Sequence, residues 1–221
     1  MIEKQFKRSP GRVLAGLAVR TFLYALLLGA IAYGLLWGAV VYDDAFYAET
    51  GPVEIMQTVF ALLTALVFLF AGRVDRNKAP CGIVLFTFLF CAVIRESDYV
   101  LDTLVCRHAW KTLVAVVLVF LTLYVWRNAK SVGRALMSFM NQPSFGILLS
   151  GLLVLVVFSR LFGYGPFWKA IMDDSSYRTV KTIVEEGVEL MGYFLILVSS
   201  FEYLHDTVIA RRNESDALSP S

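Results

Sequence analysis

Six long apolar stretches restrict what this chain can fold into. They cover about 17–41, 53–71, 80–97, 110–126, 144–162 and 182–204, and short polar connections separate them. A helix of about 20 mostly apolar residues crosses the ~30 Å of bilayer hydrocarbon. Because the backbone of such a segment must satisfy its own hydrogen bonds in lipid, helices are the expected form. The sequence therefore predicts an all-α, polytopic transmembrane helix bundle with about six spans.

Composition and helix-boundary residues agree with this interpretation. Hydrophobic residues make up 58% of the chain and charged residues 17%, a balance typical of membrane proteins. Pro52, Pro80 and Pro143 stand where the second, third and fifth spans would begin. We expect one transmembrane domain over residues 1–210 and a polar, disordered tail over 211–221.

The distribution of charge predicts the orientation. Of the 20 Lys and Arg residues, 13 fall on the N-terminal side of the predicted bundle, whereas 12 of the 18 acids fall on the other side. The positive-inside rule then places both termini in the cytoplasm. Short connections with little soluble mass favour a bacterial cytoplasmic (inner) membrane. The basic face suits anionic membrane lipids, and its scattered charges do not indicate nucleic-acid binding.

The last span carries an unusual stripe of ionisable residues. Arg178, Lys181, Glu185 and Glu189 fall on one face of a helix, and Glu186 lies on its flank. Charges inside a bilayer cost a few kcal/mol or more, so this face should point into the bundle or a wet cavity.

The end of the third span repeats the pattern. Arg95, Asp98 and Asp102 share a face if the helix continues, and Glu96 lies about 100° away from it. Arg95 follows Pro80 by 15 residues, roughly 22 Å along a helix, which places it in the outer third of the membrane. Glu189 reaches a similar depth, so the sequence predicts that Arg95 and Glu189 are partners.

Two further spans bring polar residues to the same level. The second span contributes Glu54 and Gln57, and Arg160 ends the fifth. The predicted ligand- or ion-binding residues are Glu54, Gln57, Arg95, Glu96, Asp98, Asp102, Arg160, Arg178, Lys181, Glu185, Glu186 and Glu189. A structural ion-pair network among them is the main alternative, and Arg160 alone could be a snorkelling interfacial anchor.

Metal and cofactor chemistry has few ligands to use. A hard divalent cation such as Ca²⁺ or Mg²⁺ could be bound by the carboxylates, although they lack EF-hand spacing. His108 and His205 are the chain's two histidines and would lie on opposite sides of the membrane. We therefore expect neither haem nor zinc. The sequence also lacks a serine elbow, a phosphate-binding glycine loop and a zinc-protease motif.

Three functional hypotheses follow from the ionisable residues. The first is binding or transport of an ion or small polar solute, coupled to protonation of Glu185 or Glu189. The second is an intramembrane enzyme acting on a lipid headgroup or lipid-linked precursor, with arginines holding phosphate and a carboxylate acting as base. The third is a noncatalytic subunit or scaffold that docks a membrane-protein partner. We favour the first, because the acids penetrate the membrane and no nucleophile or metal motif accompanies them.

Overall fold

The computed structural model describes residues 10–42, 46–47, 51–173 and 176–218. The chain is 89% helical, and the described ranges hold no strand. Five helices are long and apolar enough to cross a membrane: Gly11–Val41, Pro52–Val74, Ala79–Glu96, Ala109–Arg127 and Pro143–Phe162. The prediction of an all-α chain with membrane-length helices is thus confirmed. The sixth predicted span, 182–204, lies inside a longer helix that is not one of these five.

The chain divides into two compact units, residues 1–43 and 44–221. The first contains α1 (Pro10–Val41), a continuous helix of 32 residues. The second contains the remaining helices: α2 (Pro52–Val74), α3 (Ala79–Glu96), α4 (Asp98–Leu104), α5 (Ala109–Arg127), α6 (Ala129–Met140), α7 (Pro143–Leu153), the π-helical segment η3 (Val154–Phe158), α8 (Ser159–Phe162), α9 (Gly165–Lys169) and α10 (Tyr177–Leu218).

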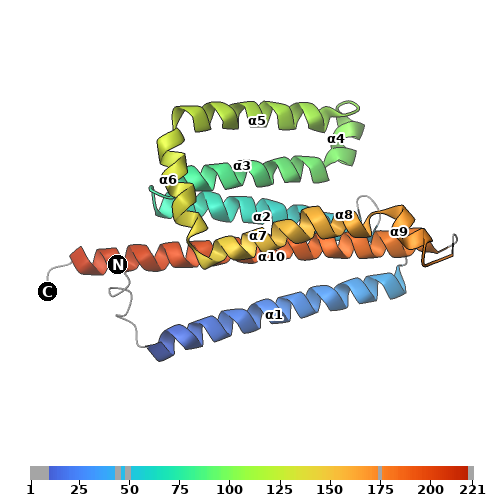
Figure 1. Ribbon diagram of the computed structural model, residues 1–221, viewed down its shortest axis with the longest axis horizontal. Helices are drawn as coiled ribbons and strands as arrows, with labels where there is room; N and C mark the ends of the chain where they lie inside the picture. Colours follow the sequence, from blue (N-terminus) through green and yellow to red (C-terminus); the bar gives the residue numbers. More distant parts are fainter. Residues whose placement is uncertain (1–9, 43–45, 48–50, 174–175, 219–221) are drawn as a thin grey trace. The chain divides into compact units, whose positions relative to one another are not determined.

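Helix α2 occupies the centre of the second unit. It packs against α3 on one side and α10 on the other, α5 packs on α3, and the run α7–η3–α8 lies along α10 (Figure 1). At one end of this bundle, Phe68 of α2, Phe139 of α6 and Tyr203 of α10 are all fully buried and their rings meet edge to face or tilted. This aromatic cluster joins three helices that are distant in sequence.

Pairs of glycines allow the helix backbones to approach closely. A Cβ on Gly82 of α3 would lie 2.6 Å from the carbonyl oxygen of Phe68 in α2. Gly151 of α7 and Gly192 of α10 face each other in the same way, since a Cβ on either would lie 3.0–3.1 Å from the other's carbonyl oxygen. Small residues at such crossings are typical of membrane helix pairs.

Three local features differ from what the sequence alone suggested. The third helix does not continue unbroken to Asp102, as a face shared with Arg95 would require, because the backbone of Ser97 leaves the helical conformation before α4 begins. The connection between the fourth and fifth spans contains the amphipathic helix α6, whose Val132, Ala135 and Phe139 are buried. Helix α10 continues to Leu218, into the segment expected to be disordered.

The C-terminal extension of α10 has contacts that support it. Arg211 donates a hydrogen bond to the carbonyl oxygen of Val74, at 3.1 Å, and pairs with Glu214 one turn further along α10, at 3.2 Å. These interactions connect the polar end of α10 to the end of α2. Residues 219–221 lie outside the described residues.

The close approach of α2 and α3 leads to a test of helix packing. We expect Gly82→Ala to lower the free energy of unfolding by about 1–3 kcal/mol, because the added methyl group would overlap the Phe68 carbonyl. Gly146→Ala is the matched control: Gly146 is also the fourth residue of its helix, and its Cβ would meet nothing within 4 Å. Thermal unfolding in detergent measures both, and equal midpoints would contradict the close packing.

Candidate functional site

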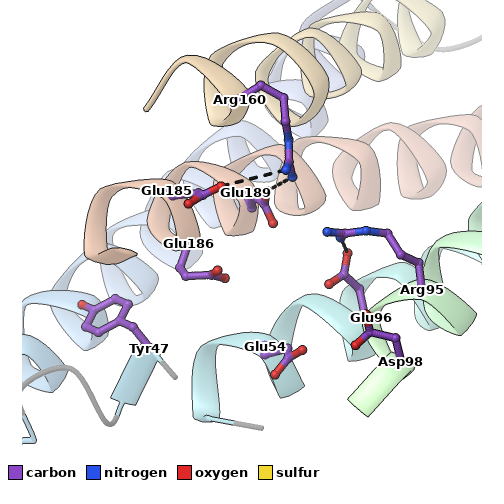
Figure 2. Close-up of a pocket in the computed structure, with 9 residues that line it drawn as sticks. All are labelled: Tyr47, Glu54, Arg95, Glu96, Asp98, Arg160, Glu185, Glu186 and Glu189. Atoms are coloured by element: carbon purple, nitrogen blue, oxygen red, sulfur yellow. Dashed lines mark hydrogen bonds and ion pairs between the residues drawn. The ribbon is translucent and has the colours of Figure 1, made fainter. Parts of the chain in front are cut away.

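A charged pocket opens between the helices at the end of the bundle opposite α6. It has a volume of about 170 Å³. Its lining comes from the N-terminal parts of α2 and α10, the C-terminal end of α3, the start of α4, helix α8 and one residue before α2 (Figure 2). The lining residues are Tyr47, Glu54, Arg95, Glu96, Asp98, Arg160, Glu185, Glu186 and Glu189.

Arg160 connects α8 to two carboxylates of α10. Its guanidinium makes a short ion pair with Glu189 and lies 3.9 Å from the Oε1 atom of Glu185. The Glu189 side chain is only 6% exposed, whereas that of Arg160 is 55% exposed. A buried carboxylate thus meets a cation that still reaches the pocket opening.

The backbone around Arg160 is adapted to this pairing. The π-helical segment Val154–Phe158 precedes it, and a π-turn rotates the residues that follow relative to a regular α-helix. The missing side chain of Gly163 leaves room for the carboxylate of Glu185, because a Cβ there would overlap that group. On the other side, Lys181 donates to Glu185 Oε2 at 2.9 Å.

A second ion pair lies across the pocket on α3. Arg95 Nη1 contacts Glu96 Oε1 at 2.5 Å, and the Tyr193 hydroxyl of α10 donates to the same oxygen at 2.8 Å. The Glu96 side chain is 7% exposed and that of Arg95 is 49% exposed. As at Arg160, the carboxylate is buried while about half of the arginine side chain is exposed.

Gln57 bonds to a third, partly buried acid, Glu186. The fully buried Gln57 side chain of α2 donates through Nε2 to Glu186 Oε2, at 2.9 Å, and to the Glu186 carbonyl oxygen, at 3.1 Å. The two bonds join α2 to α10 at a residue that lines the pocket. An amide in this role satisfies a carboxylate without adding a positive charge.

The lining is strongly unbalanced in charge. It contains six carboxylic acids and two guanidinium groups, and Lys181 supplies one further cation to Glu185. Negative charge therefore predominates in a confined, partly desolvated space, where electrostatic interactions are stronger than in water. Within the part of the chain that the structure describes, no three His, Cys, Asp or Glu side chains converge closely enough to hold a metal ion.

The structure brings together most of the predicted site residues. Eight line the pocket, and Gln57 and Lys181 each bond to one of those eight. Two lie elsewhere. Asp102 accepts a hydrogen bond from the His108 backbone at 2.8 Å, because the break at Ser97 carries α4 out of line with α3. Arg178 bonds to the hydroxyl of its neighbour Tyr177 at 3.2 Å.

The predicted partnership of Arg95 with Glu189 is not the one that forms. Both residues line the pocket, but among the described residues Arg95 pairs with Glu96 and Glu189 pairs with Arg160. The sequence predicts all four groups at one depth in the membrane. The choice between partners depended on helix rotation, which the sequence pattern does not give for α8.

Two tyrosines at the site were not predicted. Tyr193 follows Glu189 by one helical turn, so helical spacing alone would have placed it on the same face. Tyr47 precedes α2 and lies in no apolar stretch, so no periodic signal could find it. Its side chain is buried, and that burial raises the pKa of its phenol. Tyr47 therefore stays neutral at physiological pH.

Comparisons of the chain with protein-family models, with curated proteins and with solved structures find no match. The function must therefore be argued from the chemistry of the pocket itself.

The Arg160–Glu189 pair leads to a stability test. Arg160→Met should lower the free energy of unfolding by about 1–2 kcal/mol, less than loss of a fully buried partner, because water screens the half-exposed guanidinium. Adding Glu189→Gln to that variant should recover part of the loss, because no unpaired buried charge then remains. Chemical denaturation measures both, with the exposed Arg107→Met as control. Strictly additive effects would contradict a direct interaction.

Proposed function

We propose that the pocket binds a small cation or polar solute and that the protein transports this solute across a membrane. The observation that carries the proposal is the pocket lining, in which six carboxylic acids meet two guanidiniums at one end of a bundle of membrane-length helices. Intramembrane carboxylates around a cavity are typical of ion and proton pathways.

The charge of the pocket supports a cationic or zwitterionic solute. Each lining arginine already pairs with a carboxylate, Arg95 with Glu96 and Arg160 with Glu189. A phosphate group would have to displace one of those carboxylates and then face the remaining acids. The alternative of an enzyme acting on a lipid headgroup therefore receives less support.

The exposure of the arginines argues against a purely structural network. In a dry network, both partners of each ion pair would be removed from water. Here the carboxylates of Glu96 and Glu189 are buried, while about half of each guanidinium side chain remains exposed. This arrangement supports a wet pocket whose ion pairs can exchange partners.

Partner exchange at Arg160 offers a transport mechanism. A solute cation that enters the pocket competes with Arg160 for Glu189 and Glu185. Release of Arg160 would loosen the contact between α8 and α10, and a proton on Glu189 would have the same effect as a solute cation. Binding of either would thus shift the balance between two helix arrangements.

The proposed membrane topology has six spans, with both termini in the cytoplasm of a bacterial cell. Helices α2 and α7 belong to two of the segments that are long and apolar enough to cross a membrane. Helix α10 packs along both, which supports α10 as the sixth span. In this orientation the acidic pocket faces outward and α6 lies at the cytoplasmic end, in agreement with the Lys and Arg distribution.

Transport can be tested in proteoliposomes. Gradients of Na⁺, Ca²⁺ and putrescine should reveal flux of at least one of these cations in the wild-type protein, read with a pH-sensitive dye inside the vesicles and by radiotracer uptake. Glu189→Gln should reduce that flux at least about tenfold, because one charge of the pocket is lost. Glu202→Gln, the same substitution elsewhere on α10, is the control. Equal flux in wild-type and Glu189→Gln vesicles would refute the proposal.

Topology has a separate test. A membrane-impermeant maleimide should label Cys106, which is exposed beyond α4, in intact cells. Native Cys81 is buried and stays unlabelled in either orientation, so it cannot report the inner side. Ser138 is exposed on α6. In a Cys106→Ser background, Ser138→Cys should be labelled only after the cells are made permeable. Labelling of Ser138→Cys in intact cells would reverse the topology.

A further inference from the structure

The exposed face of α6 forms a second charged surface, distant from the pocket. Figure 1 shows α6 lying crosswise at the end of the bundle, between α5 and α7. Its buried face, formed by Val132, Ala135 and Phe139, packs into the ends of the bundle. The helix is therefore held across the ends of membrane-length helices, where a bilayer surface would lie.

The opposite face of α6 is basic. At about 100° per residue, Lys130, Arg134 and Met137 point away from the buried residues. Together with Ala129 and Gly133 they line a shallow depression. A Cβ on Gly133 would meet nothing within 4 Å, so the backbone between the two cations is accessible to a ligand.

The cations of this surface have no acidic counterpart. The sequence contains no Asp or Glu between Asp102 and Asp173. Within the described ranges, neither Lys130 nor Arg134 forms an ion pair. The Arg134 side chain donates a long hydrogen bond to the Lys130 carbonyl oxygen, at 3.4 Å. Like charges four residues apart on a helix repel each other, and an anion between them would remove that repulsion.

Exposed apolar residues on α6 and at the end of α5 indicate which anion fits. Met137 and Met140 are exposed on α6, and Trp126 is exposed at the end of α5. Trp residues and helices that carry both basic and apolar side chains are typical of the membrane interface, where apolar side chains reach acyl chains and cations reach headgroups.

We propose that Lys130 and Arg134 on α6 bind the phosphodiester headgroup of an anionic phospholipid, with Met137 and Trp126 against its acyl chains. The site goes beyond the transport proposal and does not depend on it. The anionic lipids of a cytoplasmic leaflet match the predicted inward position of α6. Bound lipid would fix α6, and through Phe139 the aromatic cluster at that end of the bundle.

Native mass spectrometry of the full-length protein in detergent tests this site. Titration with dioleoyl phosphatidylglycerol should show tighter binding than titration with dioleoyl phosphatidylcholine. Lys130→Gln/Arg134→Gln should weaken phosphatidylglycerol binding about thirtyfold, because each basic residue near an anionic surface contributes about fivefold. The control Arg107→Gln/Lys111→Gln removes one Arg and one Lys from the other end and should change binding less than threefold.

Three outcomes would overturn the site. Equal affinity of the wild-type protein for the two lipids would remove the headgroup specificity. If the α6 variant and the control weakened phosphatidylglycerol binding equally, the loss would come from the net charge of the protein and not from a site on α6. Competition by soluble glycerol phosphate at the lipid's own concentration would assign the site to a free anion. If the double variant fails to fold, two other variants replace it. Lys130→Arg/Arg134→Lys should retain phosphatidylglycerol binding, and Lys130→Gln alone should weaken it about fivefold.

Discussion

Glu189 is a carboxylate with little access to water on a helix that runs through an apolar bundle, so its charge needs a partner from the protein. Arg160 provides that partner, and several features of the fold serve to bring the two together. Gly151 and Gly192 allow α7 and α10 to approach closely, η3 rotates the end of this run, and Gly163 leaves space for Glu185. The position of α8 against α10 thus meets the electrostatic requirement of Glu189.

The same requirement is met differently at buried Glu96 and at partly buried Glu186. Glu96 receives a guanidinium from its own helix and a hydroxyl from Tyr193, and Glu186 receives the amide of Gln57. Three of the six lining acids, Glu96, Glu185 and Glu189, lie within ion-pair distance of the two lining arginines, so carboxylates outnumber guanidiniums in the lining. This excess of carboxylates is why the proposed ligand is a cation or a polar solute rather than an anion. The pocket couples helices that could move relative to one another when its ion pairs change.

The two ends of the second unit carry opposite charge. Acids gather around the pocket where α3, α8 and α10 meet, whereas α6 presents lysine and arginine at the other end. A membrane with an anionic cytoplasmic leaflet would favour this arrangement in one orientation, and α6 would then rest on that leaflet. Because Phe139 of α6 contacts both α2 and α10, lipid bound at α6 would stabilise the helices that also form the pocket.

The sequence by itself determined the all-α class, the membrane-length helices and the general level of the ionisable residues. These follow from run length, helical periodicity and the cost of charge in lipid, which are local properties. Only the tertiary structure decided that Arg160 rather than Arg95 pairs with Glu189, and that Asp102 leaves the site at the Ser97 break. It also decided that Tyr47 joins the site and that α6 crosses the bundle end. Such choices depend on helix rotation, on a π-turn and on packing between distant segments, none of which has a periodic signature along the chain.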